Sequence, residues 1–138
     1  MSYYLRSMIR YWKRTWNMIM FYAGKRESEW SEITVDELFE KYNSSEPPLL
    51  LDIRSNSDYE SGYGHIPDAI SIPLLELESR LDEVEAYKDR EIVTICPGGG
   101  LSLVAYELLK EAGFKDVKSL TGGTDEWRDK GYPLTNEI

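Results

Sequence analysis

The sequence is poor in the residues that bind metals and form cross-links. Its 138 residues include one cysteine, Cys96, and one histidine, His65. A single cysteine excludes an internal disulfide, and this pair excludes a conventional zinc site, which takes its ligands mainly from these two residue types. The chain also has no second thiol to resolve a group bound to Cys96, so another molecule must remove any such group. No feature indicates an oxidising compartment, and we therefore expect a cytoplasmic protein.

Long apolar runs are missing, and residues 1–26 lack acidic side chains altogether. Those 26 residues contain six Lys and Arg, so residues 27–138 hold the other ten against all 25 acids, a net charge of −15. An acidic body argues against nucleic-acid binding. A transmembrane span needs about 18 or more consecutive apolar residues, which the sequence does not contain. A signal peptide is not expected either, because a small-residue cleavage site is missing.

Residues 1–26 have the pattern of a basic amphipathic helix. Apolar side chains recur at helical spacing between Tyr3 and Tyr22, and cations fall on the other side. Such a helix can pack on the acidic body, lie at a membrane surface, dock a protein partner, or stay disordered in isolation, and the sequence leaves these alternatives open. We therefore divide the chain into a helical extension, 1–26, and a single domain, 27–138.

Strand and helix patterns alternate along the domain. The predicted strands cover residues 49–53, 69–72, 92–96 and 117–120. The predicted helices cover residues 34–42, 74–84 and 101–112, with a further short helix around Trp127. Thr34 and Glu37 form a capping box at the start of the first helix. Because no hairpin signal occurs, the alternation predicts a parallel sheet with helices on both faces and a ligand site beyond the carboxyl ends of its strands.

The candidate nucleophile is Cys96, at the carboxyl end of a predicted strand. Glycines follow at 98–100, and a helix is predicted to begin at Leu101 and Ser102. Glycines let backbone N–H groups turn toward one point, and a helix start adds unpaired N–H donors. A thiol there should ionise more readily than a free one. A buried structural cysteine is the alternative. Ser102 is expected either to cap the helix or to donate its hydroxyl to the Cys96 thiolate.

Four short motifs follow one another along the domain. They are Leu51-Asp52-Ile53-Arg54 with Asp58-Tyr59, Gly64-His65-Ile66-Pro67-Asp68-Ala69, Cys96-Pro97-Gly98-Gly99-Gly100-Leu101-Ser102, and Leu120-Thr121-Gly122-Gly123 with Trp127 and Gly131-Tyr132-Pro133. Together they resemble the rhodanese-like (thiosulfate sulfurtransferase-like) domain family over residues 30–134. The resemblance implies a three-layer α/β/α domain with a central, mostly parallel five-stranded sheet.

The same resemblance implies a sulfurtransferase. The Cys96 thiolate would take sulfane sulfur from thiosulfate, a polysulfide or a persulfide and pass it to a thiol or cyanide. The substrate-binding residues would be Pro97, Gly98, Gly99, Gly100, Leu101 and Ser102, whose backbone N–H groups would surround the bound sulfur. The reaction implies no cofactor or metal. Its partners would be a small-molecule sulfur donor and thiol acceptor, or a sulfur-carrier protein, with no nucleic acid.

Leu101 departs from the pattern of the family, which commonly has Arg or Lys at this position. A cation there would hold the sulfonate end of thiosulfate, so we expect weak use of thiosulfate or a preference for a less charged donor. Phosphatases and arsenate reductases of this fold need an Arg in the loop, and Leu101 argues against both activities. The alternative function is a non-catalytic or weakly active binding module, placed at a membrane or partner by residues 1–26.

Several polar and aromatic residues of these motifs have structural interpretations. His65 is expected to hold its loop through bonds to the backbone rather than act as a base. Asp52, Arg54 and Asp58 are expected to form a buried or half-buried ionic network. Trp127 is expected in the core.

Overall fold

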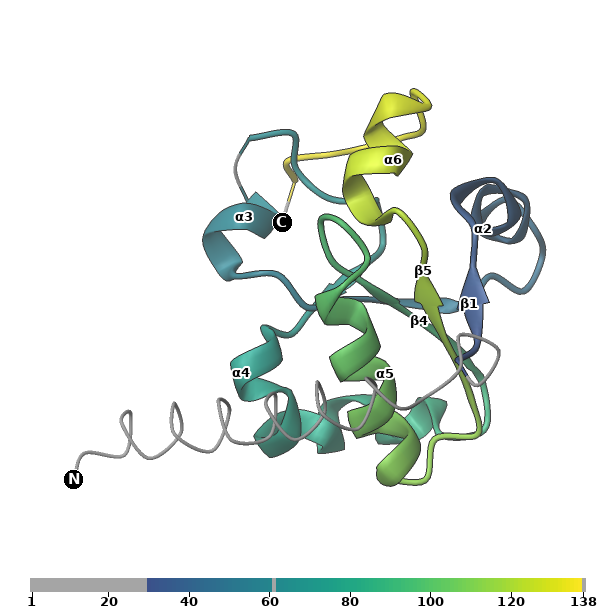
Figure 1. Ribbon diagram of the computed structural model, residues 1–138, viewed down its shortest axis with the longest axis vertical. Coiled ribbons are helices and arrows are strands. Elements are labelled where there is room, and N and C mark those ends of the chain that lie inside the picture. Colours follow the sequence, from purple (N-terminus) through teal and green to yellow (C-terminus); the bar gives the residue numbers. More distant parts are fainter. Residues whose placement is uncertain (1–29, 61, 138) are drawn as a thin grey trace. The chain divides into compact units, whose positions relative to one another are not determined.

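The computed structural model describes residues 30–60 and 62–137 (Figure 1). The helix expected within residues 1–26 lies outside the described residues. Contacts divide the chain into two units, Met1–Trp30 and Ser31–Ile138. The second unit contains the sheet, the core and Cys96, and the description below concerns this unit.

Five parallel strands form one sheet at the centre of this unit. They are β1 (Glu32–Ile33), β2 (Leu49–Asp52), β3 (Ile70–Ser71), β4 (Glu91–Ile95) and β5 (Asp116–Leu120). The order across the sheet is β1-β5-β4-β2-β3, so β4 is the central strand. It pairs in parallel with β2 on one side and β5 on the other. The four strands predicted from apolar runs are confirmed, and β1 is an additional edge strand.

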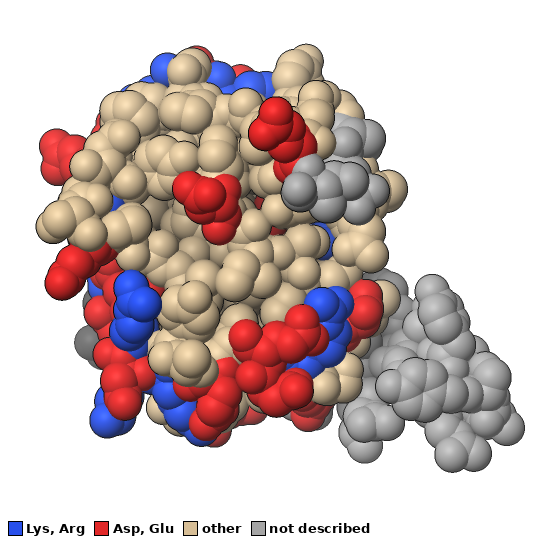
Figure 2. Space-filling model, turned by 180° about the vertical axis from the view of Figure 1, so that it is seen from behind, with Lys and Arg blue, Asp and Glu red and all other residues tan. Residues whose placement is uncertain are grey.

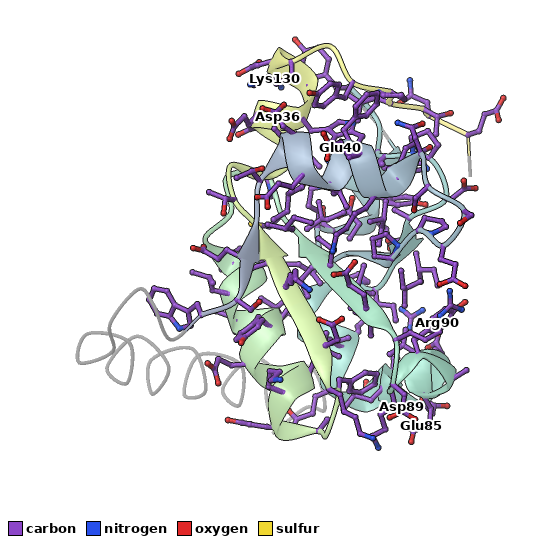
Figure 3. The ribbon with its side chains drawn as sticks, turned by 90° about the vertical axis from the view of Figure 1, so that its right-hand side faces the viewer. Asp36, Glu40, Glu85, Asp89, Arg90 and Lys130 are labelled. Atoms are coloured by element: carbon purple, nitrogen blue, oxygen red, sulfur yellow. The ribbon has the colours of Figure 1, made fainter. Side chains whose placement is uncertain are left out.

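Helices cover both faces of the sheet (Figures 1 and 3). They are α2 (Val35–Tyr42), α3 (Asn56–Glu60), α4 (Leu74–Leu77), the 3₁₀ helix η2 (Glu78–Tyr87), α5 (Leu101–Glu111) and α6 (Gly123–Asp129). Two of them, α2 and α6, lie on one face, while α4, η2 and α5 lie on the other. This arrangement confirms the predicted three-layer α/β/α architecture.

The predicted helix over 74–84 is not one regular α-helix, because it changes to a 3₁₀ helix and has a kink at Arg80 within that 3₁₀ helix. The α-helical turn α4 passes into η2, and Arg80 has non-helical angles of φ −118° and ψ 19°. Its guanidinium pairs with Glu76 on one side of the kink and Glu83 on the other. Apolar residues three positions apart, such as Leu81 and Val84 of η2, suit a 3₁₀ turn as well as an α-helix, so the pattern did not distinguish the two.

The core beneath α2 and α6 is built around Trp127, which is fully buried as predicted. Its indole N–H donates to the Pro133 carbonyl at 2.8 Å, which satisfies its only polar group. The predicted capping box is present, because Thr34 and Glu37 exchange hydrogen bonds of 3.1 Å at the start of α2. These contacts fix the helices that pack behind the Cys96 loop.

Charged side chains are concentrated on the surface of the domain. Figure 2 shows Asp and Glu side chains, interspersed with Lys and Arg, along one edge of the face opposite to that of Figure 1. Asp36 of α2 and Lys130, which follows α6, form an ion pair of 3.1 Å (Figure 3). Over residues 30–60 and 62–137, no helix combines the length and apolar character that crossing a membrane requires.

Candidate active site

Cys96 directly follows β4, the central strand, and its side chain is buried, with 2% exposed. The backbone around it is tied to α6. The Cys96 carbonyl accepts the Thr124 N–H at 3.0 Å, and the Pro97 carbonyl accepts the Asp125 N–H at the same distance. The thiol therefore lies on a backbone segment fixed by both the sheet and a helix, at the carboxyl edge where a parallel sheet places its ligand sites.

One N–H group of the loop contacts the sulfur atom. The Gly99 N–H donates to Cys96 Sγ at 3.0 Å. Gly99 has φ +91°, and an added Cβ would lie 3.0 Å from the Gly122 nitrogen, so glycine suits this position on both counts. Pro97 carries no N–H, and the prediction that it donates one is wrong. That the remaining loop N–H groups surround a bound sulfur stays a prediction.

Ser102 has neither of its two predicted roles. Its hydroxyl donates to the Gly99 carbonyl at 3.1 Å and lies 2.6 Å from the Ser119 hydroxyl. The N-cap of α5 is Gly100, which makes no side-chain cap, and Ser102 lies inside the helix. Both serines are fully buried. They connect β5 to Gly99, the residue whose N–H contacts Sγ, so Ser119 supports the site although the sequence did not indicate it.

Gly123, the first residue of α6, packs against the backbone of the Cys96 loop. A Cβ at this position would lie 2.0 Å from the Cys96 carbonyl oxygen and 2.4 Å from that of Pro97. No side chain fits at that distance. The motif analysis included Gly123 without giving it a role in the site. The available signal was a pair of glycines, Gly122 and Gly123, at a predicted strand-to-helix turn.

The predicted ionic network is present in part. Arg54 and Asp52 form a bidentate pair, with Nη2 at 2.8 Å and Nε at 3.0 Å from the two carboxylate oxygens. Arg54 Nη2 also donates to the Gly64 carbonyl at 2.9 Å, which joins β2 to the next loop. Asp58 is exposed, and the prediction that it belongs to this buried network is wrong. It lies in α3, which the sequence pattern did not reveal and which turns its side chain outward.

His65 has the predicted structural role. Its ring is buried, stacks on Tyr59 with centroids 3.6 Å apart, and makes a 2.8 Å hydrogen bond to the Tyr59 carbonyl through Nδ1. Its backbone forms an antiparallel bridge with Thr135. These contacts attach the C-terminal segment to the loop after α3.

Leu101 begins α5 directly after the loop, and 47% of its surface is exposed. An exposed apolar side chain therefore occupies the loop position where the family commonly has Arg or Lys. Backbone donors remain available there, but this side chain offers no charge to an anionic donor.

The fold and the site together define a parallel α/β domain with a thiol in a glycine-rich loop at the end of its central strand. A family model described as the rhodanese-like domain matches residues 34–130. A sulfurtransferase of Allochromatium vinosum is 34% identical over 104 residues, which are 75% of this chain and 94% of that protein. The HTH-type transcriptional regulator Rv0324 of Mycobacterium tuberculosis is 38% identical over 104 residues, which are 74% of this chain.

Solved structures agree with these matches. The rhodanese-related protein of Thermoplasma volcanium has a TM-score of 0.69 at 28% identity, and the match covers 78% of this chain and 100% of that one. The chain belongs to the rhodanese-like domain family. It spans 43% of the length of the regulator and 57% of another curated relative, so its family includes larger proteins that contain this domain as one part.

Proposed function

We propose that this chain is a sulfurtransferase that carries sulfane sulfur as a persulfide on Cys96. The observation that carries the proposal is the 3.0 Å hydrogen bond from the Gly99 N–H to Cys96 Sγ, at the carboxyl end of the central strand. A donor at this distance stabilises negative charge on Sγ, both in the thiolate and as Sγ leaves during transfer. The kinship with a protein named as a sulfurtransferase supports the same chemistry.

The reaction has two balanced steps. The Cys96 thiolate attacks the outer sulfur of the donor. If the donor is thiosulfate, the S–S bond breaks, its electron pair leaves with sulfite, and the outer sulfur remains on Sγ as a persulfide anion. An acceptor thiolate or cyanide then attacks that sulfur, the bond to Sγ breaks, and its electron pair returns to Cys96. No resolving cysteine is needed, which agrees with the single cysteine of the chain.

Intact-mass measurement tests the proposal directly. The protein is incubated separately with thiosulfate and with polysulfide, and the expected result is a gain of one sulfur atom that cyanide removes. Cys96→Ser is the matched control and should gain no sulfur, because it replaces the nucleophile with a poor one of similar size. Failure of every donor to produce the adduct would overturn the proposal.

Leu101 gives a prediction about the choice of donor. Replacing it with Arg places a guanidinium beside the loop and should lower the KM for thiosulfate by about tenfold, the effect of roughly one charge-assisted hydrogen bond. The KM for polysulfide should change less, because its terminal charge is not a sulfonate. Leu101→Gln is the control for polarity without charge. An unchanged KM in Leu101→Arg, or an equal fall in both variants, would contradict the role of charge.

A second candidate is a binding or regulatory module with little catalysis. The observation that favours it is the relative named as a transcriptional regulator, whose match to this chain covers 74% of the chain. Under this function the loop would bind a ligand or partner without catalysing sulfur transfer. The mass experiment separates the two functions, because a module of this kind yields no cyanide-sensitive sulfur adduct.

A further inference from the structure

A pocket of about 350 Å³ lies at the amino edge of the sheet, the edge opposite to the one that Cys96 follows. Its wall includes Leu49 at the start of β2 and Arg90 directly before β4. Figure 3 shows Arg90 at the end of the sheet away from Asp36, which lies at the carboxyl edge. The volume falls within the range of about 300–1,000 Å³ that small-molecule sites occupy. The pocket is therefore large enough for a ligand and separate from the sulfur.

Arg90 brings an uncommitted cation to this pocket. It is the one arginine of residues 30–60 and 62–137 that pairs with no carboxylate. Glu85, Asp89 and Glu91, near it in the sequence, pair with lysines instead. The guanidinium lies over the Tyr87 ring, 5.3 Å from the centroid, which holds it at the pocket wall. A guanidinium held by a ring, with its N–H groups uncommitted, is a donor for an anionic ligand.

Asp68 gives the pocket an exposed carboxylate. Within the described part of the chain, this carboxylate forms no hydrogen bond or ion pair. Asp68 has φ +71°, a left-handed conformation that no other described non-glycine residue adopts. Asp tolerates this conformation better than most residues, but glycine adopts it at no steric cost. A side chain at a position that suits glycine better indicates that its carboxylate has a use.

Two half-buried tyrosines add hydroxyl groups to the same pocket. None of the described residues forms a hydrogen bond with the hydroxyl of Tyr42 or of Tyr87. Burial and the charge of Asp68 raise the pKa of Tyr42, so its hydroxyl keeps its proton and remains a donor. The Tyr42 ring makes an edge contact with the buried Trp127, with centroids 5.9 Å apart, and is therefore held in place.

The combination of these groups defines the chemistry of a ligand. Pro48 and Leu49 are buried and form an apolar part of the wall, which together with the phenol rings suits the face of an aromatic ring. Arg90 suits an anionic group, and Asp68 suits an N–H donor on the ring. These two residues do not pair with each other, so each can bind a different part of one molecule. A nucleoside monophosphate combines all three features.

We propose that this pocket is a second binding site, for planar heteroaromatic molecules that carry an anionic group, of the class of nucleoside monophosphates. The phosphate pairs with Arg90, the base packs on the apolar wall, and the amino group of the base donates to Asp68. The site uses no residue of the Cys96 loop. It therefore goes beyond the proposed function and does not depend on it.

Calorimetric titration of the full-length protein with adenosine monophosphate tests the site. We expect Arg90→Ala to weaken binding by about tenfold, because one charge-assisted contact is lost. Asp68→Asn removes the charge but keeps a residue that accepts the left-handed conformation, and it should weaken binding by about threefold. Arg128→Ala is the matched control, since Arg128 also lies over a tyrosine ring, 4.4 Å from the Tyr63 centroid, but beside the Cys96 loop. Its affinity should be unchanged.

The parts of the ligand supply the second measurement. Adenosine and inorganic phosphate, titrated separately, should each bind about tenfold more weakly than adenosine monophosphate. Phosphate that binds as tightly as the nucleotide would refute the aromatic class of ligand. No binding of the nucleotide up to millimolar concentration, equal affinity of Arg90→Ala and the unchanged protein, or a loss in Arg128→Ala would overturn the inference.

Cys96→Ser separates this site from the proposed function. The variant should bind adenosine monophosphate with unchanged affinity, and a loss of binding would place the ligand at the sulfur and overturn the inference. Binding that depends on Arg90, in a protein that never forms the persulfide, would support this site and refute the proposed function. A persulfide that forms in a protein without nucleotide binding would do the reverse.

Discussion

At the scale of single residues, the Cys96 loop depends on a chain of buried hydroxyl groups. Ser119 on β5 contacts Ser102, and Ser102 donates to the carbonyl of Gly99, whose N–H contacts the sulfur. Thr94 on β4 donates to the Ser102 carbonyl at 2.8 Å. Thr94, Ser102 and Ser119 are fully buried, so removal of the Ser102 hydroxyl leaves the Ser119 hydroxyl and the Gly99 carbonyl without this partner.

Ser102→Ala tests this chain. The variant leaves the Gly99 carbonyl and the Ser119 hydroxyl without their partner, and we expect the free energy of unfolding to fall by about 1–3 kcal/mol. Urea denaturation measures it. Ser79→Ala is the control, because the Ser79 hydroxyl also donates to a backbone carbonyl, at 2.9 Å, but on the exposed surface. Its change should stay within about 0.5 kcal/mol. Equal losses in the two variants would show that burial is unimportant.

Prediction from sequence at this scale succeeded where a residue contacts its own neighbourhood and failed where it contacts distant segments. His65 bonds to Tyr59, six residues away, and its structural role was predicted. Ser102 meets Ser119, 17 residues away on another strand, and its partner was not predicted. Asp58 was misplaced because a short helix turns it outward. Side-chain direction is set by the backbone, and a motif alone does not specify it.

At the scale of secondary-structure elements, Glu91 connects three of them. Glu91 is the first residue of β4. Its carboxylate accepts a hydrogen bond from the Lys41 ammonium of α2 at 2.7 Å and another from the Lys118 ammonium of β5 at 2.5 Å. Burial alone raises the pKa of Glu91, but the hydrogen bonds and charges of the two lysines outweigh it, and the pKa lies below the ordinary 4.5. The ionised form is therefore more favoured in the folded chain than in the unfolded chain.

A depressed carboxyl pKa predicts the direction of the pH dependence. The stabilisation by Glu91 is complete above its ordinary pKa and is lost as the pH falls toward and through the folded pKa. Glu91→Gln should therefore lower the free energy of unfolding by about 1 kcal/mol near pH 7, with the difference shrinking toward about pH 3. Urea denaturation across this range measures it. Glu85→Gln removes an exposed pair with Lys88 and should show little change at any pH. A pH-independent effect of Glu91→Gln would contradict this explanation.

The contact between α6 and the Cys96 loop gives another prediction. Gly123→Ala places a methyl group against the carbonyl oxygens of Cys96 and Pro97, and we expect unfolding to become easier by more than about 2 kcal/mol. Formation of the persulfide should slow as well, because the loop must move to make room. For comparison, a Cβ on Gly98 meets no atom within 4 Å, so Gly98→Ala should alter stability far less. Thermal unfolding and the intact-mass assay measure the two effects.

The strand at 92–96 and the helix after the Cys96 loop were predicted well from their apolar patterns, whereas the pattern over 74–84 did not reveal the change from α4 to η2. The run 92–96 and the helix from Leu101 were predicted within one or two residues of β4 and α5. The strand β1 has two residues and α3 has five, so each contains too few repeats of its pattern to be recognised. The count of five strands came from the resemblance to a family, because apolar runs alone indicated four.

At the scale of the whole molecule, charge separates the chain into two unequal parts. The first 26 residues are purely basic, and the rest carries a net charge of −15. The largest fully buried side chains among the described residues all lie between Val35 and Trp127, inside the second unit. A chain that begins at residue 27 therefore keeps the described core but loses all six cations of the first segment.

Removal of residues 1–26 should leave a domain that unfolds cooperatively. Because its net charge is then −15, self-repulsion should lower its melting temperature at low salt, and added NaCl should raise it more than in the full chain. Calorimetry at several salt concentrations measures this. Flotation with anionic liposomes separates the alternatives for the segment. If the full chain floats with the liposomes and the shortened chain does not, residues 1–26 form a membrane helix. Equal flotation of the two chains excludes one. A salt response identical in both chains would contradict the electrostatic argument.

The central position of β4 has a consequence for how motion is distributed around the sulfur. Its backbone amides are hydrogen-bonded within a sheet that has partner strands on both sides, so they should exchange with solvent only when the domain unfolds. Gly98 and Gly100, a few residues further along, are exposed and contact no neighbouring side chain at the Cβ position. The nucleophile thus directly follows the strand expected to exchange most slowly, whereas Gly98 and Gly100 of its loop are expected to exchange much faster. A sulfur atom held in place beside a flexible loop can react with sulfur donors whose leaving groups differ in size.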